Sequence, residues 1–144
     1  MARRQRASAS LVPVALIQLK QMIDGAQSEL DRGRSHTSGT LSVSAAIRAV
    51  DLICDTRLGE HSTGANHRGA IDLLATLEGL ENLVEDFSLC QSHKTEFNYH
   101  ASALNLQHAS EVLAAARRLA AEAVKGVVAN QWFPIGLNPT DFTF

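Results

Sequence analysis

Long apolar runs are absent from this sequence, and so are the glycine-rich loops that hold nucleotides. The apolar stretches are interrupted by charge well before the roughly 18–20 residues that cross a bilayer, so we expect no membrane partner. No Gly-x-x-x-x-Gly-Lys-Ser/Thr or Gly-x-Gly-x-x-Gly motif and no paired Cys-x-x-Cys motif occurs. We therefore expect neither an NTPase nor a dehydrogenase, and we expect no cofactor and no resident metal.

Cysteine is also scarce. The two cysteines, Cys54 and Cys90, both lie inside apolar helical patterns. A free cysteine in such a position behaves as a small buried hydrophobe, so we interpret both as structural thiols.

Positive charge is limited and concentrated at the start of the chain. Arg3, Arg4 and Arg6 supply three of the 13 basic residues, which leaves 10 basic against 15 acidic residues in the body. An acidic body argues against a broad nucleic-acid surface, so any RNA contact would be local. The apolar stretch Leu11–Leu19 contains Pro13 and Gln18. We therefore expect no signal peptide and a cytoplasmic location.

Apolar residues recur with the spacing of amphipathic helices along most of the chain. The pattern predicts helices over about 9–32, 41–57 and 66–90, the third extending toward Tyr99, and a fourth from Ser102 or Asn105 to about 127. Gly33 ends the first helix, and the polar residues 34–39 form a connection. The predicted fold is an all-α, up–down antiparallel four-helix bundle with room for a short fifth helix.

One domain over residues 9–130 accounts for this pattern, between a basic flexible N-terminus (1–8) and an aromatic-rich, non-helical tail (131–144). The tail contains the only tryptophan and three of the five phenylalanines: Trp132, Phe133, Phe142 and Phe144. Aromatic side chains are costly to leave in water. They pack either on the chain's own bundle or on a partner, which can be a second copy.

The up–down order decides which polar residues can meet. It places the first connection, with Arg32, Arg34 and His36, at the same end as the segment that holds His93, Lys94 and His100. It places the loop after the second helix, with His61 and His67, at the other end.

Two stretches resemble the HEPN superfamily of small helical domains. Ala45–Cys54, continuing through Gly64–Leu74, is similar to that family's second helix, its turn and the opening of its third helix. Lys94–Tyr99, followed by Ala109–Leu119, is similar to the family's basic residue, nearby tyrosine and alanine-rich fourth helix. The resemblance covers about residues 10–125.

The resemblance implies a four- or five-helix bundle that is commonly a homodimer. Members include metal-independent endoribonucleases, toxins and defence components, as well as binding modules. Catalytic members carry an arginine, four to six residues, and then a histidine. Here Lys94 precedes His100 by five intervening residues, and lysine lacks the planar fork with which arginine holds a phosphate. Lys94 would bind the phosphate, His100 would transfer the proton and Tyr99 would orient the substrate.

Other interpretations of the same residues remain open. His93, Glu96 and His100 share one helical face and could bind zinc. One loop contains a second polar cluster that could contact a ligand: Glu60, His61, Asn66, His67 and Arg68. The hypothesis that we favour is an RNA- or nucleotide-associated binding module in which Arg32, Arg34, His36 and His93 contact the ligand. The alternatives are an endoribonuclease and a structural subunit that binds its partner through the aromatic tail.

Overall fold

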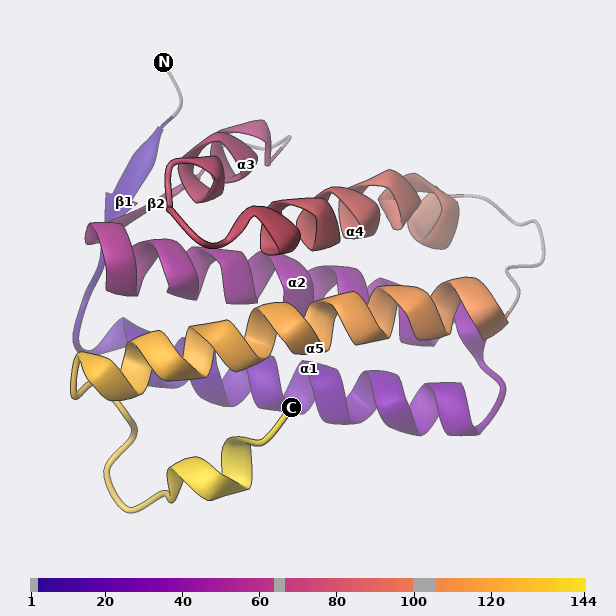
Figure 1. The fold of residues 1–144 in the computed structure, drawn as a ribbon. Helices are drawn as coiled ribbons and strands as arrows, with labels where there is room; N and C mark the ends of the chain where they lie inside the picture. Colours follow the sequence, from indigo (N-terminus) through magenta and orange to yellow (C-terminus); the bar gives the residue numbers. More distant parts are fainter. Residues whose placement is uncertain (1–2, 64–66, 100–105) are drawn as a thin grey trace.

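Four long helices, alternately up and down, form the body of the molecule (Figure 1). The computed structural model describes residues 3–63, 67–99 and 106–144, with only the backbone for 95–99. Its long helices are α1 (Leu11–Asp31), α2 (Ser35–Leu58), α4 (Glu81–Tyr99) and α5 (Leu106–Ala129), and a short helix α3 (Arg68–Ala75) precedes α4. The all-α, up–down bundle predicted from the sequence is confirmed.

Helix α2 is the central element, since it packs against α1, α4 and α5. Its alanines Ala45, Ala46 and Ala49 are fully buried, and such small side chains let neighbouring helices approach closely. The approach is close at Gly126 of α5, where an added Cβ would clash with the side chain of Thr56. The core around α2 therefore depends on small residues as well as on leucines.

The second helix begins earlier than its sequence suggests. Residues 34–39 were expected to be a connection, but α2 starts at Ser35. The reason is that its serines bury their hydroxyls in hydrogen bonds: Ser38 Oγ donates to the Ala26 carbonyl at 2.8 Å, and Ser42 Oγ donates to the Ser38 carbonyl at 2.9 Å. At 24 residues, α2 is about 36 Å long rather than about 25 Å.

The expected third helix is divided into α3 and α4. Gly79 has φ +80°, a left-handed conformation that favours glycine, and it allows the chain to reverse. Leu74 and Leu80 on either side of the break are both buried, so the apolar period continues although the helix does not. As a result α3 lies over α4 instead of extending it (Figure 1).

A two-stranded ribbon closes one end of the bundle. Strand β1 (Arg4–Arg6) pairs antiparallel with β2 (Glu60–Ser62), and Gln5 stands opposite His61. From the sequence we expect a flexible N-terminus and a loop in place of β1 and β2, because strands of three residues are too short to show the alternation of apolar and polar residues that indicates a strand. Arg4 Nη1 donates to Glu60 Oε1 at 2.6 Å across the ribbon, and β2 packs on α2.

The aromatic tail folds back on its own bundle. Phe142 is buried, Trp132, Phe133 and Phe144 are partly buried against the core, and the rings of Phe133 and Phe142 meet edge to face at 5.0 Å. A short 3-10 helix, η1 (Pro139–Phe142), interrupts the expected non-helical tail. None of the described helices combines the length and the hydrophobicity that a bilayer-spanning segment requires.

Candidate functional site

The site predicted around residues 93–100 is only partly described. His100 and the side chains of Glu96 and Tyr99 lie outside the described residues, and so do the proposed Lys94–His100 pair and the zinc alternative. The end of α4 does lie at the same end of the bundle as the connection between α1 and α2 (Figure 1), as the topology predicted.

The expectation that Lys94 lies far from His67 is wrong. Burial and, next, the positive charge of Lys94 lower the pKa of His67, so the two side chains are close enough to interact. The reversal at Gly79 is the cause, because it brings the start of α3 back over α4. His67 itself begins α3 with φ +56° and makes no side-chain cap hydrogen bond. Asn66, from the same predicted loop cluster, lies outside the described residues.

The other predicted binding residues separate into different groups. Arg32 and Arg34 both pair with Glu29, at 3.6 and 3.5 Å, so part of their positive charge is offset. His36 is exposed in the first turn of α2. His93 lies against His108 of α5, with ring centroids 5.1 Å apart, a pairing that the sequence did not predict.

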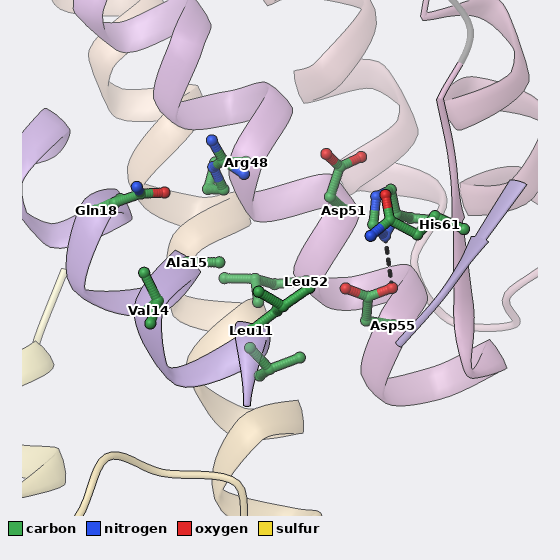
Figure 2. Close-up of a pocket in the computed structure, with 11 residues that line it drawn as sticks. Leu11, Val14, Ala15, Gln18, Arg48, Asp51, Leu52, Asp55 and His61 are labelled. Atoms are coloured by element: carbon green, nitrogen blue, oxygen red, sulfur yellow. Dashed lines mark hydrogen bonds and ion pairs between the residues drawn. The ribbon is translucent and has the colours of Figure 1, made fainter. Parts of the chain in front are cut away.

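A second group of polar residues meets at a cavity of about 290 Å³ between α1, α2 and the ribbon, which we call the α1–α2 cavity (Figure 2). Its polar lining residues are Gln5, Gln18, Arg48, Asp51, Asp55 and His61. Its apolar lining residues are Leu11, Val12, Val14, Ala15 and Leu52.

An Asp–His pair forms one wall of the α1–α2 cavity. Asp55, near the end of α2, is only 7% exposed, and His61 Nδ1 donates to its Oδ1 at 2.7 Å. Strand pairing with β1 holds His61 in place. The hydrogen bond to Asp55 raises the pKa of His61 against the opposing effect of burial, and the charges of Asp51 and Asp55 raise it further.

Asp51 lies one helical turn before Asp55 on the same face of α2, because residues four apart are neighbours on a helix. The pKa of its carboxyl group is raised to about 6, mainly by burial; the charge of Asp55 also raises this pKa, and the charges of His61 and Arg48 lower it. Among the described residues, no hydrogen bond or ion pair reaches the Asp51 carboxylate. It is therefore a half-buried acid without a partner.

Arg48 and Gln18 face the same cavity without partners. The described residues offer neither side chain a hydrogen bond or an ion pair, whereas Arg118 elsewhere on the bundle holds Asp86 with two hydrogen bonds of 2.9 and 2.8 Å. Figure 2 shows Arg48 and Asp51 on α2 and Gln18 across from them on α1. Gln18 is exposed, and Arg48 and Asp51 are half-buried, so a ligand in the cavity could reach all three side chains.

No protein-family model and no curated protein matches this sequence, so the chemistry of the cavity rests on its own residues. The described lining contains no serine, threonine or cysteine that could act as a nucleophile. The nearest thiol, Cys54, is buried, and burial together with Asp51 and Asp55 raises its pKa to about 12, so it stays protonated. Cys90 is buried with a pKa of about 12 as well.

Sequence reasoning missed this site although a signal was present. Arg48, Asp51 and Asp55 interrupt an otherwise apolar stretch of α2 at spacings of three and four residues. Charged residues are rarely buried, so three of them on the inner face of a helix indicate a candidate functional site. His61, in contrast, reaches the cavity only through the ribbon.

Proposed function

We propose that this chain is a helical binding module and that the α1–α2 cavity is its ligand site. The observation that carries the proposal is the convergence of three polar side chains, Gln18, Arg48 and Asp51, on a cavity with an apolar opposite wall, where none of the three pairs with a described residue. Ligand sites typically combine an apolar lining with a few polar groups that fix orientation. A bound ligand would supply the partners that the fold does not.

Two further features support binding at this place. Asp51 has a strongly shifted pKa, and shifted acids in a cleft are candidates for functional sites. The rim includes Leu11 and Val14, which are 54% and 51% exposed, so a ligand could cover apolar surface as it enters.

The proposal can be tested by filling the cavity. Ala15 lines it, so Ala15→Phe should occupy the space without removing a charge, and Gln21→Phe adds the same ring at an exposed position of α1. Amide NMR spectra would be recorded with amino acids, primary amines, monocarboxylates and nucleoside monophosphates. Shifts confined to residues 5, 11–18, 48–55 and 60–62 are expected in the wild type and in Gln21→Phe, and they should vanish in Ala15→Phe. Shifts that survive in Ala15→Phe, or no shifts with any compound, would contradict the proposal.

A second candidate is RNA contact by a HEPN-like module along the later part of α4. Two contacts favour it: Lys94 lies near His67, and the ring of His93 lies against that of His108. Basic and imidazole groups are suited to phosphate binding and proton transfer. We keep the endoribonuclease role of Lys94, Tyr99 and His100 as part of this proposal.

Incubation with RNA in excess EDTA separates binding from cleavage. Cleavage by the wild type but not by Lys94→Ala/His100→Ala would establish a metal-independent endoribonuclease. Retardation of RNA without cleavage, lost in Lys94→Ala and retained in Lys125→Ala, would establish binding alone. Neither cleavage nor retardation would remove this candidate.

Association with a second copy or a partner protein is also part of the proposal. The tail uses its aromatic rings on the bundle, but Ile135 and Leu137 stay exposed. Light scattering of Ile135→Asp/Leu137→Asp should give a smaller mass than the wild type. An unchanged mass would exclude these two residues as the contact.

A further inference from the structure

We propose that the α1–α2 cavity recognises a small zwitterion, a molecule that carries an ammonium group and a carboxylate a few atoms apart, such as a free α-amino acid with an apolar side chain. This inference rests on the binding role proposed above and names the ligand class for the same cavity.

The charges on α2 carry the inference. Arg48 and Asp51 are three residues apart and so are neighbours on the helix surface, yet they form no ion pair with each other. Each therefore keeps its capacity to bind an opposite charge. An amine alone would satisfy only Asp51, and a carboxylate alone would satisfy only Arg48, whose planar fork matches a carboxylate. A zwitterion satisfies both.

The remaining walls suit the rest of such a molecule. Ala15, Val14 and Leu52 offer an apolar surface beside the two charges (Figure 2), and Gln18 can both donate and accept a hydrogen bond. At about 290 Å³ the cavity is at the lower bound of the roughly 300–1,000 Å³ of pockets that hold drug-sized ligands. The space fits an amino acid better than a nucleotide.

Binding should depend on pH in a defined direction. The charged groups around Asp51 are Arg48 and Asp55 on α2 and His61 on β2, while α1 and β1 contribute the neutral Gln18 and Gln5. Asp51 must be ionised to bind an ammonium group, and its pKa is about 6. Affinity for the zwitterion should therefore rise between pH 5 and pH 7.

Three ligands of matched shape test the class: leucine, 3-methylbutylamine, which lacks the carboxylate, and 4-methylpentanoate, which lacks the amine. Titration calorimetry and NMR up to about 10 mM would reveal a site of millimolar affinity. Leucine should bind roughly tenfold more tightly than either analogue, as expected for one added charge-assisted contact. Arg48→Met should reduce leucine to the affinity of the amine, and Asp51→Asn should reduce it to that of the carboxylate.

A matched control is available on α1. Lys20 and Asp24 are an exposed cation and acid one turn apart, but they already pair at 2.7 Å, so Lys20→Met and Asp24→Asn should leave leucine binding unchanged. If the amine or the carboxylate binds as well as leucine, or if guanosine monophosphate binds more tightly, the zwitterion inference is wrong and the cavity remains a ligand site. If no compound binds, both proposals fail.

Discussion

Asp55 and His61 join two elements that the sequence alone would not connect, because their 2.7 Å hydrogen bond ties strand β2 to the buried face of α2. The bond holds the ribbon over the α1–α2 cavity and keeps one of the two acids of this face occupied. Asp51, the other acid, makes no hydrogen bond to the described residues, and it is the carboxylate that we propose binds the ligand.

The Asp55–His61 bond should make stability depend on pH through His61. The pKa of His61 is raised in the folded protein, so its contribution is complete below the unfolded value of about 6.5 and is lost as pH rises through the folded value. His61→Gln should therefore destabilise the protein more at pH 6 than at pH 9, as measured by urea unfolding. His36→Gln, which changes an exposed histidine on α2, is the matched control. An equal loss at both pH values would contradict this role for the bond.

Asp51 should lower stability at neutral pH. Its folded pKa is about 6 against an ordinary 3.8, so the folded state disfavours the ionised form, and stability falls as pH rises from 3.8 to about 6 and stays at the lower level above that. The difference corresponds to at most about 3 kcal/mol. Asp51→Asn should therefore stabilise the protein at pH 8 and change little at pH 4, while it weakens ligand binding. The exposed Asp24→Asn is the control, and destabilisation by Asp51→Asn at pH 8 would count against an unpaired acid.

Lys94 should control the titration of His67. Its charge helps to lower the pKa of His67, so Lys94→Gln should raise that pKa toward the ordinary value of about 6.5. NMR titration of the imidazole resonances measures the change, and Lys125→Gln on α5 is the control. If the pKa of His67 is the same in Lys94→Gln as in the wild type, then α3 does not lie over α4.

The contact between α2 and α5 should not tolerate a larger residue at Gly126. An added Cβ would lie 2.2 Å from Thr56 Oγ1 and 2.9 Å from Thr56 Cβ, so Gly126→Ala should cost about 1–3 kcal/mol through overpacking. Gly25→Ala is the matched helix-to-helix control, since its Cβ would meet only the flexible Leu41 Cδ1 at 3.2 Å. Thermal unfolding compares the two variants. Equal melting temperatures would show that the helices can move apart at little cost.

The long helices could be predicted because their apolar period is strong and Gly33 ends the first of them. The start of α2 could not be predicted, because Ser35 to Gly39 resembles a loop, and the buried hydrogen bond from Ser38 to the Ala26 carbonyl that favours the helix is a tertiary contact. The break at Gly79 could not be predicted either, because Leu74 and Leu80 continue the helical spacing of apolar residues on both sides of it. For the site, Asp51 and Asp55 are visible as charges within an apolar helix. Their meeting with His61 depends on a ribbon that is too short to leave a pattern.

The most direct measurement is an NMR titration of the Asp51 carboxyl carbon with and without leucine. An unpaired, half-buried acid awaiting a cation should titrate near pH 6 in the free protein. Its midpoint should fall by about one unit or more with saturating leucine, since one unit equals a tenfold preference for the ionised form. A free midpoint near 4, or a midpoint that leucine does not move, would contradict the account.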